Sequence, residues 1–218
     1  MNTTPASETE RPGTRLYKEV YHPGPQPTWF HTFIMGKTRI YFGWLVMMAF
    51  GFAAREYPTW PGILVCGLGA AFRVWSSGYL RKNDRLAIGG PYALTRNPLY
   101  FGTYVMAVGA SLSLENIPLV VFVTVLFGVV YHLTIVEEET KLKVLFGPAY
   151  LRYLASVNRF FPSLPPAEKT RLEINAYRED WSFSWEVAKT NRAWDPLTAW
   201  VGFIGYLSLC AWLWKNWG

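Results

Sequence analysis

The chain has 218 residues and a net charge of +6, with 17% charged residues, 17% aromatic residues and 11 tryptophans. Soluble domains typically carry about 25% charged residues, so this composition disfavours an ordinary soluble protein and favours an integral membrane protein with long wet segments. The two cysteines do not support a disulfide framework, residues 1–38 show no secretory signal pattern, and neither a dinucleotide fingerprint nor a P-loop is present.

Five apolar segments follow the N-terminal tail. A membrane-spanning helix needs about 20 apolar residues, with about 17 as the lower limit, and the first three segments reach that limit only when flanking tryptophans and tyrosines are included. The segments cover residues 40–54, 60–75, 99–114, 117–136 and 197–214. They predict an all-α, polytopic membrane protein with about five transmembrane helices.

The connections between these segments predict two hairpins. Residues 55–59 join the first two spans, and Glu115-Asn116 joins the third and fourth. Such short connections suit only antiparallel neighbours. The two ends of the third and fourth spans, residues 97 and 137, should therefore return to the same side of the membrane.

Lysine and arginine set the predicted orientation. Of the 21 basic residues, five lie in the tail to residue 39, four in the loop 76–98 and nine in residues 137–196. All three regions fall on one side if every span crosses, and an excess of basic residues marks the cytoplasmic side. The pattern predicts a cytoplasmic N-terminus and an external C-terminus, in a bacterial or archaeal inner membrane, with charge directed at lipid headgroups and no nucleic acid partner.

The same pattern divides the chain into four regions. Residues 1–39 form a cytoplasmic or interfacial tail, 40–162 a membrane core, 163–196 an amphipathic cytoplasmic segment and 197–218 a C-terminal transmembrane helix. In the third region Trp181 and Trp185 would share one helix face. Residues 177–194 are a hypothetical lid over an acceptor entrance, and a plain linker to the last span is an equal alternative.

Three polar groups are predicted to converge on the cytoplasmic side of the second hairpin. They are residues 90–98, Glu137 to Glu139, and the stretch from 142 to 162. Asn97-Pro98 is a good helix start, with asparagine as N-cap. Three acids at the end of a helix would oppose its macrodipole, which favours a functional role for the glutamates over a merely solvated helix end.

The motifs resemble a known enzyme family. GPYALTRNPLYFG (90–102), EExxLxxxFGxxYxxY (138–153) and VNRFFP (157–162), separated by an apolar hairpin, resemble the isoprenylcysteine carboxyl methyltransferase and phospholipid methyltransferase family. The resemblance covers roughly residues 60 to 164. It implies an integral membrane methyltransferase that uses S-adenosyl-L-methionine, with the cofactor at the cytoplasmic end of the hairpin.

The resemblance also implies which residues hold the cofactor. Asn97 stands where the family commonly has histidine; it keeps a hydrogen-bond donor and an acceptor but cannot titrate. Carboxylates suit the ammonium and ribose of the cofactor, an arginine suits its carboxylate, and aromatic faces suit the sulfonium or the adenine. The implied set is Tyr92, Arg96, Asn97, Tyr100, Glu138, Glu139, Tyr150 and Tyr153, without a metal ligand.

The sequence leaves the methyl acceptor open. An amphipathic, isoprenylcysteine-carboxylate-like acceptor from the bilayer needs a cation such as Arg73 or Arg159, whereas a phospholipid amine needs a base such as Glu138. These three are the catalytic candidates. Two rival functions remain, an NADPH-dependent membrane reductase of the sterol-reductase type and a non-enzymatic membrane scaffold.

Overall fold

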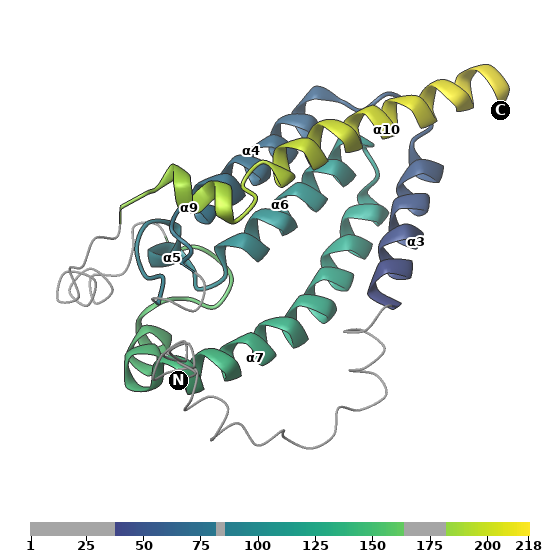
Figure 1. Cartoon of the computed structure of the whole chain (residues 1–218). Helices are drawn as coiled ribbons and strands as arrows, with labels where there is room; N and C mark the ends of the chain where they lie inside the picture. Colours follow the sequence, from purple (N-terminus) through teal and green to yellow (C-terminus); the bar gives the residue numbers. More distant parts are fainter. Residues whose placement is uncertain (1–37, 82–85, 164–181) are drawn as a thin grey trace, which may run out of the picture.

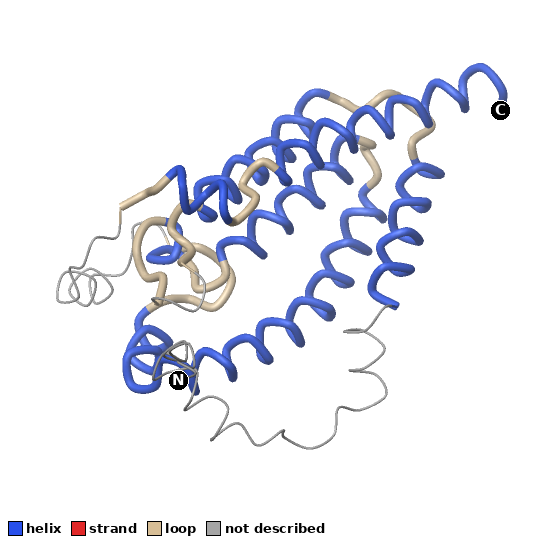
Figure 2. Tube along the Cα trace, in the orientation of Figure 1, coloured by secondary structure: helices blue, strands red, loops and turns tan. Residues whose placement is uncertain are grey.

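A computed structural model describes residues 38–81, 86–163 and 182–218, and these form helices and loops without a strand (Figures 1 and 2). The predicted all-α class is confirmed for this part of the chain. The helices are α3 (Thr38–Ala53), α4 (Trp60–Ser77), α5 (Pro91–Leu94), α6 (Pro98–Ser113), α7 (Ile117–Ser156), α9 (Trp185–Thr190) and α10 (Asp195–Trp217). The N-terminal tail and most of the predicted amphipathic segment, including Trp181, lie outside the described residues.

Each of the five predicted spans coincides with a helix, but the helices differ in length. Among the described residues, α7 and α10 are long and apolar enough to cross a membrane. Helices α3 and α6 have 16 residues each and α4 has 18, which is about 24 to 27 Å at 1.5 Å per residue. The five-span topology therefore stays a prediction.

Small residues bring α4 and α6 close together. A Cβ added at Gly62 would lie 2.1 Å from the backbone nitrogen of Ser113, and one at Gly109 would lie 2.3 Å from that of Cys66. At the other end, a Cβ at Gly102 would lie 2.5 Å from Cγ of Arg73. Such close approach is typical of helix pairs in membranes, and it fixes Arg73 against the first turns of α6.

Helix α7 corrects the prediction that the fourth helix ends at the glutamates. It continues to Ser156, with one break at Gly147 (φ 50°, ψ −128°). Glu137, Glu138 and Glu139 thus lie inside a helix, and the argument from an opposed macrodipole does not apply to them. The apolar part, residues 117–136, is about 30 Å long, matching a hydrocarbon core, and a polar helix extends beyond it.

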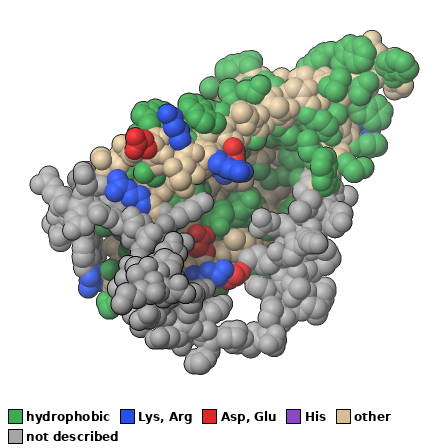
Figure 3. Space-filling model, viewed as in Figure 1, with side chains coloured by type: hydrophobic (Ala, Val, Ile, Leu, Met, Phe, Trp, Pro, Cys, Tyr) green, Lys and Arg blue, Asp and Glu red, His purple; other side chains and the backbone are tan. Residues whose placement is uncertain are grey.

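Helix α10 packs against α3 and α4. The indole nitrogen of Trp200 donates to the carbonyl of Ile63 at 3.2 Å, and the hydroxyl of Tyr206 donates to that of Met47 at 3.0 Å. On the face shown in Figure 3, hydrophobic side chains cover the end formed by α3 and α10, while most of the charged side chains gather toward α5 and α9. The charged end is where the polar motifs meet.

Candidate active site

Hydrogen bonds join the motif before α6 (90–102) to the VNRFFP motif (157–162). The backbone nitrogen of Arg96 donates to the carbonyl of Asn158 at 2.9 Å, and the hydroxyl of Thr95 donates to the carbonyl of Phe160 at 2.8 Å. The backbone nitrogen of Ser163 donates to the carbonyl of Leu94 at 3.0 Å. Residues 94–97 and 158–163, more than 60 positions apart in sequence, therefore form one unit at the start of α6.

Glu139 lies at the centre of this unit between two arginines. Its side chain is 6% exposed, and Arg159 contacts it through Nε at 3.2 Å and Nη2 at 2.9 Å. Nη2 of Arg96 lies 3.2 Å from the same carboxylate, and its Nη1 donates to the carbonyl of Leu154 at 3.2 Å. Charge-assisted, two-pronged contacts of this kind fix geometry strongly. One donor, Nε of Arg96, is buried without a partner among the described residues.

The neighbouring glutamates face other directions. Glu138 is exposed, and its carboxylate accepts a hydrogen bond from the hydroxyl of Tyr100 on α6 at 2.9 Å. The ring of Tyr100 meets that of Tyr131 on α7 at 5.1 Å between centroids. Glu137 pairs with Lys141 one turn further along α7. Of the three acids, Glu139 is enclosed by arginines and Glu138 presents a carboxylate beside α6.

Asn97 occupies the predicted place at the start of α6 but has a different partner. Its side chain makes no capping bond, and its amide nitrogen donates instead to the carbonyl of Arg159 at 2.8 Å. The helix begins at Pro98 with Asn97 in the N-cap position, as predicted, but the Asn97 side chain does not make the capping hydrogen bond expected there. Asn97 holds in place the backbone of the residue whose side chain binds Glu139.

Three buried tyrosines pack behind the charged residues of the site: Tyr92, Tyr150 and Tyr153. The hydroxyl of Tyr153 donates to the carbonyl of Tyr92 at 2.6 Å, and the rings of Tyr150 and Tyr153 lie 6.0 Å apart. Burial raises the pKa of Tyr153 well above its ordinary value, and burial together with the charge of Glu138 raises the pKa of Tyr92. Both phenols are thus held in the neutral, hydrogen-bonding form.

Two glycines set the chain direction at these tyrosines. Gly90 has φ 56° and ψ −126°, and Gly147 has φ 50° and ψ −128°. Positive φ favours glycine because it has no Cβ, and in both places a proline follows and begins a new helical stretch. The same Gly-Pro sequence thus sets the backbone direction just before Tyr92 and just before Tyr150, in two different parts of the chain.

Arg73 lies apart from the glutamates. Its Nη1 donates to the hydroxyl of Thr103 on α6 at 3.0 Å, and its Nε is buried without a partner in the ranges that the structure describes. Among the described residues it forms no ion pair. Thr103 lies one turn beyond Tyr100, which places Arg73 deeper along α6 than the carboxylates.

Several residues of the site carried no clear signal in the sequence. Phe160 contacts the rings of Phe101, Tyr104 and Phe127 at 5.7 to 5.8 Å, and so fills the space between α6 and α7. Thr95 is fully buried and ties the two motifs together. Thr95 and Phe160 each stand next to an arginine of a quoted motif, and this position was the one sequence signal for them. Thr103 and Tyr131 lie inside apolar runs, where the sequence gives no sign of a role in the site.

Comparison with known proteins connects this geometry to a family. Residues 64–149 match the phospholipid methyltransferase family. The matched stretch includes Arg73, the loop from Tyr92 to Tyr100 and all three glutamates. Tyr150, Tyr153 and Arg159 lie beyond the matched residues, and the contact between Arg159 and Glu139 ties that region to the matched stretch.

Two curated bacterial relatives share about half of the chain. The cobalt-zinc-cadmium resistance protein CzcN of Cupriavidus metallidurans is 30% identical over 105 residues, covering 47% of this chain and 48% of its own. The nickel-cobalt-cadmium resistance protein NccN of Alcaligenes xylosoxydans xylosoxydans is 31% identical, covering 47% and 49%. The match thus spans about half the length of these relatives. No solved structure matches the chain significantly.

Proposed function

We propose that the chain is a membrane methyltransferase that transfers a methyl group from S-adenosyl-L-methionine to an amphipathic, lipid-like acceptor. The observation that carries the proposal is the enclosure of Glu139 by Arg96 and Arg159, with Glu138 and Tyr100 beside it. This arrangement unites residues of the family domain with the motif that follows it. A purely structural hairpin would not need such a concentration of charge at one end.

The residues fit the chemical groups of the cofactor. S-adenosyl-L-methionine carries a carboxylate, an ammonium, a sulfonium and ribose hydroxyls. Arg96, whose buried Nε has no partner in the described part of the chain, suits the carboxylate. Glu138 is exposed and has acceptor capacity beyond its bond from Tyr100, which suits the ammonium or the ribose. Tyr150 and Tyr153 are enclosed in this structure, so their proposed part is to hold the walls of the site.

The protein contributes positioning and exclusion of water. When bound, the cofactor supplies an activated methyl group, whose transfer is an in-line displacement that depends on alignment. Arg159 and Asn97 hold the VNRFFP motif (157–162) against the start of α6. The aromatic rings around Phe160 keep water away from the region between α6 and α7.

Arg73 is the preferred cation for the acceptor. Arg159 is already bound to Glu139 through two nitrogens, whereas Arg73 has no carboxylate partner among the described residues. An ionisable residue inside an apolar helix marks a functional site by default. This favours an isoprenylcysteine-carboxylate-like acceptor, which is already anionic. For an amine acceptor, as in phospholipid N-methylation, Glu138 would be the base.

The proposed location follows from charge. The segments that lead into the site and away from it hold most of the lysines and arginines, which supports a site on the cytoplasmic side of an inner membrane. The family domain and two apolar helices indicate a membrane protein. An acceptor with an apolar chain would then enter from the bilayer, and S-adenosyl-L-methionine from the cytoplasm.

The deciding experiment measures binding and transfer together. The protein in lipid nanodiscs is titrated with S-adenosyl-L-methionine and with NADPH, and is then incubated with radiolabelled cofactor and a total membrane extract. We expect saturable S-adenosyl-L-methionine affinity, and label in an extractable lipid-like product. Glu138→Gln combined with Glu139→Gln should abolish binding, while Glu137→Gln should not. NADPH binding without S-adenosyl-L-methionine binding would indicate the reductase. A wild-type protein that binds neither molecule and transfers no label would indicate a scaffold, and a double variant that still binds S-adenosyl-L-methionine would refute the part proposed for the two glutamates.

The names of the two relatives favour a second candidate, a part in resistance to divalent transition metals. In residues 38–81, 86–163 and 182–218, no group of three or more histidine, cysteine, aspartate or glutamate side chains is arranged to hold a metal ion. Direct metal binding therefore has no ligand set there. Equilibrium dialysis with Zn²⁺, Co²⁺ and Cd²⁺ distinguishes the two: stoichiometric metal without S-adenosyl-L-methionine affinity would favour this candidate.

A further inference from the structure

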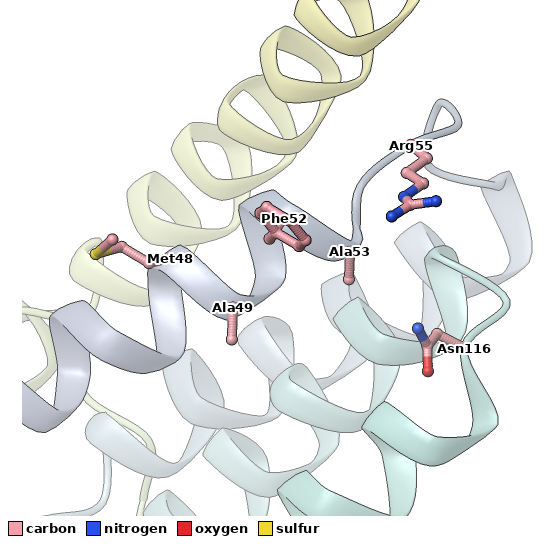
Figure 4. A pocket seen from close by; sticks show the side chains of 6 residues that line it. All are labelled: Met48, Ala49, Phe52, Ala53, Arg55 and Asn116. Atoms are coloured by element: carbon pink, nitrogen blue, oxygen red, sulfur yellow. The ribbon is translucent and has the colours of Figure 1, made fainter. Parts of the chain in front are cut away.

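A cavity of ≈ 740 Å³ opens at the end of the molecule opposite the glutamates. Met48, Ala49, Phe52 and Ala53 of α3 form its apolar wall, and Arg55 and Asn116 form its polar rim (Figure 4). Asn116 and Glu138 are 22 positions apart on one helix, or about 33 Å. The cavity is therefore separate from the proposed methyl-transfer site.

The wall of the cavity is a stripe on one face of α3. Residues 48, 49, 52 and 53 recur at the spacing of one helix face, and Met48 and Phe52 are 67% and 66% exposed. Ala49 and Ala53, each next to one of these large side chains, leave room where larger side chains would fill the groove. A volume of this size is within the range of small-molecule sites, and its apolar lining suits a hydrocarbon chain.

The rim carries hydrogen-bond donors from two elements. Arg55 forms no ion pair among the described residues; its guanidinium lies over the ring of Trp214, 5.3 Å from the centroid. The adjacent acid, Glu56, is bound by Lys215 at 2.6 Å. The side-chain oxygen of Asn116 accepts from the backbone nitrogen of Leu119 at 2.9 Å, so its amide nitrogen is the group left to donate. Glu115, the other acid nearby, does not line the cavity.

The geometry points to a phospholipid bound at this cavity, with its phosphate at Arg55 and Asn116 and one acyl chain along the α3 stripe. A guanidinium and an amide at one rim recognise a phosphate through charge-assisted bonds. The apolar stripe continues about 7 Å from that rim toward the middle of the helix, which is the direction an acyl chain takes from its headgroup. This lipid is a bound structural partner, and its site does not depend on the proposed methyl transfer.

The test is native mass spectrometry of the full chain, delipidated in detergent and titrated with dioleoyl phosphatidylglycerol. We expect one lipid bound per chain, with roughly tenfold weaker binding for Arg55→Gln, in line with loss of a charge-assisted contact of about 1.4 kcal/mol. Ala49→Phe, which fills the groove, should reduce binding as much, while Ala49→Ser should bind as the wild type does. Circular dichroism and size-exclusion profiles confirm that each variant is folded.

Lys215→Gln is the matched control, because Lys215 lies at the same end but already pairs with Glu56. Its lipid affinity should stay within twofold of the wild type. An equal loss for Lys215→Gln would overturn the proposal, since general surface charge would explain it. So would unchanged binding by Ala49→Phe, equal binding of dioleoylglycerol, which lacks the phosphate, or a dimer that Ala49→Phe dissociates without any bound lipid.

Discussion

Arg159 holds the carboxylate of Glu139 with two nitrogens, at 3.2 and 2.9 Å, across 20 residues of sequence. The contact spans the break in α7 at Gly147 and brings the VNRFFP motif (157–162) back onto the helix that carries the glutamates. Because Arg96 binds the same carboxylate from the loop before α6, one buried acid connects three segments. The first prediction concerns that acid.

Glu139→Gln should destabilise the protein and abolish cofactor binding. The substitution leaves two guanidinium groups facing each other without a carboxylate. Breaking a buried ion pair costs about 3 to 5 kcal/mol, and the low end applies here because the Arg159 side chain is 45% exposed. Thermal unfolding in detergent and titration with S-adenosyl-L-methionine measure the two effects. Glu137→Gln, which weakens a partly exposed pair with Lys141, should stay within about 1 kcal/mol of wild type; equal losses would refute the central role of Glu139.

Tyr100→Phe should weaken cofactor binding without reducing stability. The phenol donates to the exposed carboxylate of Glu138, where water can replace it, and the ring contact with Tyr131 is retained. Without this bond the Glu138 carboxylate is no longer held beside α6, and we expect a loss of cofactor affinity of up to about tenfold, or about 1.4 kcal/mol. Calorimetric titration checks the affinity. An unchanged affinity would show that Tyr100 only positions a surface carboxylate.

Asn97→His should retain cofactor binding, whereas Asn97→Ala should weaken it. The structure supplies the reason, because the Asn97 amide donates to the carbonyl of Arg159 at 2.8 Å and an imidazole N–H can replace that donor. Asn97→Asp, which places an acceptor against the carbonyl, should be the most damaging of the three. Affinities in the order histidine, alanine, aspartate support this role. A histidine variant weaker than the alanine variant would contradict it.

The sequence predicted the convergence of the polar motifs better than the length of the helix that carries the glutamates. Spacing across a short hairpin was enough to bring Asn97 and the glutamates to the same end. The end of α7 was not predictable from hydropathy, because residues 137–146 lose apolar character yet remain good helix formers. The partner of Asn97 was equally out of reach, since a side-chain cap is local and the carbonyl of Arg159 is 62 residues away.

Tyr153→Phe should make the protein less sensitive to alkaline pH. Burial raises the pKa of Tyr153 well above the ordinary 10.0, so the unfolded state loses this proton first as the pH rises past about 10. The stability linked to the neutral phenol is thus constant below pH 10 and falls above it. The variant should lose about 1 kcal/mol at neutral pH, through its bond to the carbonyl of Tyr92, and fall less steeply between pH 10 and 11. Tyr57→Phe, at an exposed position, is the control.

Arg73→Gln should separate acceptor binding from cofactor binding. Arg73 contacts Thr103 and no carboxylate among the described residues, and its Nε is buried without a partner. Removing a buried, unpaired charge does not reduce stability, so unfolding should be unchanged or slightly improved. If Arg73 binds an anionic acceptor, KM for that acceptor should rise about tenfold or more while S-adenosyl-L-methionine affinity stays the same. Lys143→Gln, an exposed cation on α7, should change neither; a loss of cofactor affinity in Arg73→Gln would place this arginine in the cofactor site instead.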